Sequence, residues 1–83
     1  MNTEHVTYAK LEELLHRHEF RALSSRKRKV KAYQHARTQT LVLLTERQPE
    51  EFVQAADVLL VKRQLVDSGI MQADAFRSWL AAA

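Results

Sequence analysis

The sequence predicts an all-α fold, a small three- or four-helix bundle with a central helical hairpin. The chain has one glycine and one proline, whereas a strand-rich domain normally uses several of both in its turns. Apolar residues also recur three and four positions apart through much of the chain, which is the spacing of one helix face. The 83 residues fit a single helical domain, residues 1–83, and leave no room for a second.

Two helices are predicted in the first half of the chain. The first covers about residues 4–23, where apolar residues follow helical spacing, and Asn2 or Thr3 is expected to cap it. The second follows a break at residues 24–25 and continues to about residue 47. The apolar stripe of this second helix consists of Val30, Tyr33, Leu41 and Leu44.

Two further helices are predicted in the second half. The third begins at Pro49, because proline suits the first position of a helix, and it ends before Gly69, which supplies a left-handed stop. The fourth covers about residues 72–82 and presents Phe76, Trp79 and Leu80 on one face.

The runs at residues 41–44 and 58–61 are apolar around the whole circumference of a helix, although a surface helix needs only a stripe. Two explanations remain open. The two runs form the buried hairpin of a monomer, or they form an interface with a second copy or another protein. The mass of the protein in solution separates these explanations.

Composition excludes several classes of protein. No cysteine is present, which excludes disulfides, thiolate metal sites and cysteine nucleophiles. The longest apolar runs are far shorter than the ~20 residues of a membrane-spanning helix. The first residues lack the basic and apolar stretches of a secretion signal. We therefore expect a cytoplasmic protein with no membrane partner.

Basic side chains are concentrated in residues 21–37, hereafter the basic segment, which contains seven cations and no acid. These cations are Arg21, Arg26, Lys27, Arg28, Lys29, Lys31 and Arg37. Phosphate is the natural counterpart of such a run, and neutral side chains such as Tyr33, His35 and Thr38 lie among the cations as further contacts. The alternative interpretation is a solvated helix end or a contact for an acidic protein surface.

Catalytic and metal sites are not expected. His16 and His18 are two positions apart, which places them on opposite sides of a helix. Glu12 and Glu13 are adjacent on a helix and point apart, so they do not form a pair of catalytic carboxylates. A single glycine excludes glycine-rich phosphate-binding loops. We therefore expect no enzymatic activity and no cofactor.

The leading prediction is a small helical regulatory protein that contacts DNA or RNA phosphates through the basic segment and works as a dimer. The alternative is a protein-protein interaction module, such as an adaptor, chaperone or inhibitor of a larger protein, that uses its apolar helix surfaces. Its interface residues are Leu41, Leu44, Phe52, Leu59, Phe76 and Trp79.

Overall fold

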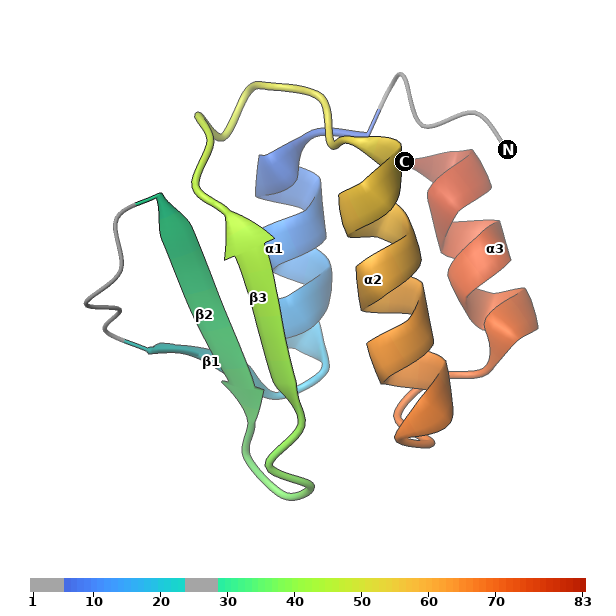
Figure 1. The fold of residues 1–83 in the computed structure, drawn as a ribbon. Coiled ribbons are helices and arrows are strands. Elements are labelled where there is room, and N and C mark those ends of the chain that lie inside the picture. The colour runs from blue at the N-terminus through green and yellow to red at the C-terminus, as the bar shows by residue number, and fades with distance from the viewer. Residues whose placement is uncertain (1–5, 24–28) are drawn as a thin grey trace.

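The structure, a computed structural model, describes residues 6–23 and 29–83 and has an α+β fold. The elements in chain order are α1 (Tyr8–Arg17), β1 (Phe20–Leu23), β2 (Val30–His35), β3 (Leu41–Thr45), α2 (Ala55–Asp67) and α3 (Ala73–Ala82). The strands form one antiparallel sheet in the order β1-β2-β3, and the helices lie on one side of it (Figure 1). The predicted all-α fold, with its helical bundle and central helical hairpin, is therefore wrong.

The predicted second helix is replaced by β2 and β3. In β3, Val42 and Leu44 are buried against the helices, whereas Leu41 and Leu43 are exposed on the opposite face of the sheet. This alternation is the period of a strand, but leucines occupy both faces and hide it in the sequence. A short continuous apolar run does not distinguish a strand from a buried helix. The helical interpretation of residues 41–44 is wrong for this reason.

Tight turns form here without glycine, which explains why the scarcity of glycine is misleading. Glu19, Lys29 and Gln39 have φ values of 67°, 64° and 63°, in the left-handed region that non-glycine residues seldom adopt. Glu19 joins α1 to β1, Lys29 precedes β2, and Gln39 lies between β2 and β3. These three residues occupy conformations for which a strand-rich domain commonly uses glycine.

A buried imidazole stabilises the turn between β2 and β3. The Nδ1 atom of His35 accepts hydrogen bonds from the backbone N–H groups of Arg37 and Thr38, at 3.2 and 3.1 Å. The ring also packs edge-on against Phe20, with centroids 5.2 Å apart. His35 is therefore a structural residue, and it is not exposed as a contact for a ligand.

The predicted helices are present at both ends of the chain, but with different boundaries. The first helix begins at Tyr8, with Thr7 as its N-cap, and ends at Arg17. The helix predicted from Pro49 begins at Ala55. The reason is that residues 49–53 run along the start of α1, where the Pro49 carbonyl accepts a 2.9 Å hydrogen bond from Ala9 N–H. The segment thus satisfies an N–H group that has no partner within α1.

The predicted stop at Gly69 is confirmed. Gly69 has a φ of 71°, and its N–H donates to the Val66 carbonyl at 3.0 Å. The N–H of Ile70 donates to the Leu65 carbonyl at 3.0 Å, which completes a Schellman motif. The fourth predicted helix is confirmed as α3, which packs beside α2 (Figure 1).

The hydrophobic core lies between the sheet and the helices, and every element contributes to it. Fully or almost fully buried members include Leu11, Phe20, Tyr33, Val42, Leu44, Val61 and Phe76. Tyr8 ties α1 to α2, because its hydroxyl donates a 2.6 Å hydrogen bond to the Asp57 carboxylate. Within the described residues, no helix is both long and apolar enough to span a bilayer.

Replacement of Gln39 by glycine is expected to stabilise the fold. The left-handed conformation costs a residue with a side chain about 1–2 kcal/mol, and glycine avoids this cost. Glycine loses more chain entropy on folding, which reduces the gain. The free energy of unfolding should therefore rise by about 0.5–1 kcal/mol. Gln39→Ala keeps its Cβ and should give no gain. Urea denaturation of both variants measures the difference, and equal stabilities would contradict the explanation.

Candidate functional site

The structure describes four of the seven cations of the basic segment. Arg21 is exposed on β1, and Lys29 is exposed at the start of β2. Lys31 lies in β2 on the helix side of the sheet, and Arg37 lies in the turn after β2. The remaining three, Arg26, Lys27 and Arg28, lie outside the described residues, between β1 and β2 in the sequence.

Two of these four cations form ion pairs with carboxylates of the same chain. Lys31 Nζ lies 2.9 Å from a carboxylate oxygen of Glu12 on α1. Arg37 forms a 3.2 Å ion pair with Glu19, in which both side chains are mostly exposed. Arg21 and Lys29 form no ion pair with any other residue that the structure describes. Of the seven cations predicted to contact phosphate, Lys31 and Arg37 thus have carboxylate partners within the protein.

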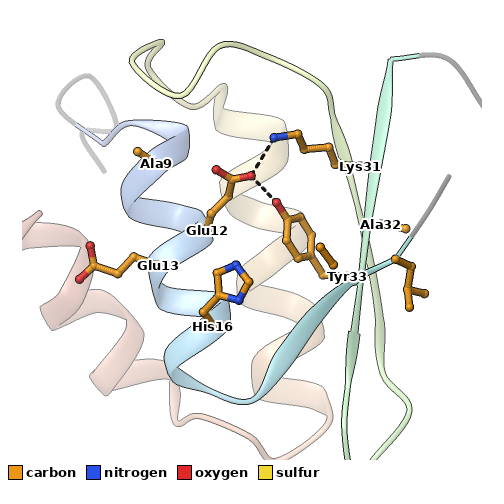
Figure 2. Close-up of a pocket in the computed structure, with 9 residues that line it drawn as sticks. Ala9, Glu12, Glu13, His16, Lys31, Ala32 and Tyr33 are labelled. Atoms are coloured by element: carbon orange, nitrogen blue, oxygen red, sulfur yellow. Dashed lines mark hydrogen bonds and ion pairs between the residues drawn. The ribbon is translucent and has the colours of Figure 1, made fainter.

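A hollow of about 590 Å³ opens between α1 and the strands β1 and β2 (Figure 2). Its polar walls are Glu12 and His16 of α1 together with Lys31 and Tyr33 of β2. Glu13, Ala9 and Ala22 also line it. Leu23 and Ala32 complete the lining, but their side chains alternate with those of Ala22, Lys31 and Tyr33 and so point to the other face of the sheet. The volume falls within the range of about 300–1,000 Å³ that is usual for small-ligand sites.

One carboxylate oxygen organises the polar side of the hollow. The Tyr33 hydroxyl and the Lys31 ammonium both donate hydrogen bonds to Oε1 of Glu12 (Figure 2). Burial alone would raise the pKa of Glu12, but the two hydrogen bonds and the Lys31 charge outweigh it, and the pKa is lowered. Burial and the contact with Glu12 raise the pKa of the Tyr33 hydroxyl. At neutral pH the site therefore holds a carboxylate anion and a neutral phenol.

Glu12 is the site residue that sequence reasoning missed. Glu12 and Glu13 do point apart, as expected, with Glu13 paired to Arg17 at 2.9 Å and directed away from the strands (Figure 2). Glu12 instead faces the sheet. The signal was present in the sequence, because Glu12 lies one turn from both Tyr8 and Leu15 and so shares the apolar face of α1.

His16 is an exposed wall of the hollow. Its ring stands edge-on to Tyr33, with centroids 6.2 Å apart and planes at 83°. Among the described residues, no cluster of three or more histidine, aspartate or glutamate side chains is arranged to hold a metal ion. The aromatic ring, the carboxylate and the ammonium group can instead contact an organic ligand through stacking and hydrogen bonds.

The six residues predicted as a partner interface do not form one surface. Leu44 and Phe76 belong to the core, and Trp79 packs partly buried beside Phe76 with ring centroids 5.4 Å apart. Leu41, Phe52 and Leu59 are exposed, but they come from β3, the following loop and α2 respectively. The prediction of an interface on apolar helix surfaces is therefore wrong for Leu44 and Phe76.

A different apolar surface is present on the side of the sheet away from the helices. We call it the open sheet face, and it consists of Arg21, Leu23, Val30, Ala32, Gln34, Leu41, Leu43 and Thr45. Strand register aligns Leu23, Ala32 and Leu43 in one row across the sheet. Leu23 and Leu43 are 42% and 47% exposed, so this row is accessible to solvent.

Replacement of Glu12 by glutamine should change the pH dependence of stability. Because the folded pKa of Glu12 lies below its ordinary value of 4.5, the ionised carboxylate stabilises the fold above that pH, and its contribution is lost as pH falls through the folded pKa. Glu12→Gln should thus cost about 1–2 kcal/mol at neutral pH, and progressively less in acid.

Urea denaturation across a pH series measures this difference. Glu13→Gln is the matched control, since its exposed ion pair with Arg17 contributes little. A difference between wild type and Glu12→Gln that stays constant from about pH 7 to pH 3 would contradict the stabilising role of the ionised carboxylate.

The described residues provide exposed cations on β1 and before β2, a polar hollow and an apolar sheet face. The hollow can donate and accept hydrogen bonds, and the exposed cations can bind anions. No protein-family model, curated protein or solved structure matches this chain. The function is therefore inferred from the geometry and charge of these surfaces alone.

Proposed function

We propose that the protein binds nucleic acid through phosphate contacts made by the basic hairpin, which we define as β1, β2 and the residues 24–29 that join them. Pairing of Leu23 with Ala32 makes the two strands one antiparallel ribbon. Arg21 and Lys29 form no ion pair with any described residue, and the sequence places three further cations, Arg26, Lys27 and Arg28, between the two strands. This concentration of charge is the observation that carries the proposal.

The charge balance of the hairpin favours an anionic partner. The basic segment contains no acid, and the two ion pairs formed by its described residues use carboxylates from outside it, Glu12 and Glu19. The exposed side chains of Arg21 and Lys29 have no such partner among the described residues. Cations close together in the sequence repel each other, and phosphate groups relieve that repulsion while counterions are released.

The position of the hairpin is also suitable for a nucleic acid. β1 is an edge strand of the sheet, and an exposed basic edge can follow the sugar-phosphate backbone of a duplex or of a single strand. Arg21 provides a planar guanidinium group that can contact phosphate in a bidentate manner. DNA and RNA are both compatible with these contacts.

Removal of the hairpin cations should weaken binding and reduce its salt dependence. In a variant carrying Arg26→Ala, Lys27→Ala, Arg28→Ala and Lys29→Ala, the slope of log affinity against log salt should fall by up to about 0.9 for each duplex phosphate that is no longer neutralised. Fluorescence anisotropy with a labelled random-sequence duplex, at about 50 and 200 mM salt, measures the slope.

A matched control removes the same charge elsewhere. The control variant carries Arg47→Ala, Lys62→Ala, Arg63→Ala and Arg77→Ala, all outside the basic segment. It should retain the wild-type slope if the hairpin is the binding site. Equal reductions of the slope in the two variants would instead indicate an effect of net charge alone, and an unchanged affinity in the hairpin variant would contradict the proposal.

A second candidate function, self-association or another protein contact, is favoured by the open sheet face. Leu41 and Leu43 are 44% and 47% exposed on β3, and β3 is an edge strand without any charged residue. Edge strands of monomers are commonly protected by lysine, proline or a bulge, and β3 has no lysine or proline. We propose a second copy of the chain as the partner, because the neutral strand β3 creates no like-charge contact with its own copy.

A charge on β3 should prevent self-association. Leu43→Lys should weaken association by about tenfold or more, while helicity stays unchanged because Leu43 is already exposed. Leu59→Lys, at an exposed position of α2, is the control and should associate like the wild type. Sedimentation velocity over a concentration series measures the mass, and a wild-type protein that is monomeric throughout would contradict this candidate function.

A further inference from the structure

We propose that the hollow between α1 and the basic hairpin receives one unstacked base of a single-stranded nucleic acid. This inference rests on the nucleic-acid binding proposed above and adds a class of substrate to it. A base inside a duplex is stacked and paired, so it reaches such a hollow only after leaving the stack. The hollow therefore favours single strands over duplexes.

The lining of the hollow suits the flat surface of a base. Ala9 of α1 and Ala22 of β1 provide small apolar contacts. The exposed ring of His16 provides an aromatic surface beside them (Figure 2). Aromatic side chains commonly bind the bases of single strands by stacking, which is tolerant of sequence because every base has such a face.

Two polar groups in the hollow fit the hydrogen-bonding edge of a base. Tyr33 and Lys31 both donate hydrogen bonds to Oε1 of Glu12. No described residue donates a hydrogen bond to Oε2. Oε2 can therefore accept a hydrogen bond from an exocyclic amino group, as carboxylates do from cytosine N4. The Lys31 ammonium has three protons, of which one is used by Glu12, so it can donate to a neighbouring ring nitrogen or carbonyl of the same base.

The position of the hollow joins it to the cations of the hairpin. Leu23 and Lys31, which line the hollow, lie on the strands that lead into and out of the basic connection. Lys29 lies two residues before Lys31, at most about 7 Å along the chain. A strand whose phosphates contact the hairpin thus has a base within reach of the hollow.

The first experiment compares probes that share phosphates but differ in bases. Anisotropy would be measured for the wild-type protein with labelled oligodeoxycytidylate, an abasic strand of the same length and the corresponding duplex. The cytidylate strand should bind about tenfold more tightly than the abasic strand, which is the contribution of one stacked base. Oligothymidylate, which lacks an exocyclic amino group, should bind more weakly than oligodeoxycytidylate.

The second experiment blocks the hollow without removing any charge. Ala9→Leu places a larger side chain on the exposed surface of α1 at the hollow, where leucine is compatible with a helix. The variant should lose about tenfold in affinity for oligodeoxycytidylate and none for the abasic strand. Ala56→Leu, at an exposed position on α2, is the matched control and should behave as the wild type. Circular dichroism verifies that both variants fold. If Ala9→Leu does not fold, Ala22→Leu blocks the hollow from the side of β1 and provides an independent test.

The outcomes separate this inference from the proposed function. Equal wild-type affinity for the cytidylate and abasic strands, or unchanged cytidylate binding in Ala9→Leu, would overturn the base site and leave phosphate binding by the hairpin in place. Absence of salt-dependent binding to every probe would overturn both. Loss of cytidylate binding in Ala9→Leu alone, with the abasic strand unaffected, would support both.

Discussion

The Glu12 carboxylate is the group on which the arrangement of α1, the sheet and the hollow depends. It accepts hydrogen bonds from Tyr33 and Lys31 of the central strand, and it is carried by α1. A partly buried carboxylate is stable only when its charge is compensated, so the helix and the central strand are held together at this point. The hydrogen-bonded groups of Glu12, Tyr33 and Lys31 also form the polar wall of the hollow. Because Lys31 is paired with Glu12, it is not counted among the cations proposed to neutralise phosphate.

Folding therefore divides the described cations of the basic segment into two that form ion pairs and two that do not. Lys31 stabilises the position of α1 and Arg37 pairs with Glu19, whereas Arg21 and Lys29 have no described carboxylate as an ion-pair partner. Strand alternation explains part of this division, because Lys31 of β2 faces the helices and Arg21 of β1 faces away from them. Arg37 follows β2 and meets Glu19, which precedes β1. The proposed hairpin interface and the proposed base site are consequences of this division, since one uses the exposed cations and the other uses the space beside Lys31.

The open sheet face reflects the small size of the domain. The helices all lie on one side of the sheet (Figure 1), so the leucines on the other side remain in contact with solvent. A domain of about this length buries only ~60–65% of the surface of its unfolded chain. Apolar area that the domain cannot cover itself is available to a second copy, and β3 presents it on the side of the sheet opposite the helices.

The sequence by itself determined the two C-terminal helices, the stop at Gly69 and the concentration of cations, since these depend on local periodicity, local backbone conformation and composition. Only the tertiary structure decided that residues 30–45 form strands. Leucines on both faces of β3 conceal its alternation, and the left-handed turns at Glu19, Lys29 and Gln39 lack the usual glycine. The role of Glu12 was likewise decided by tertiary structure, because its partners Lys31 and Tyr33 are distant in the chain and meet it only when α1 packs on the sheet.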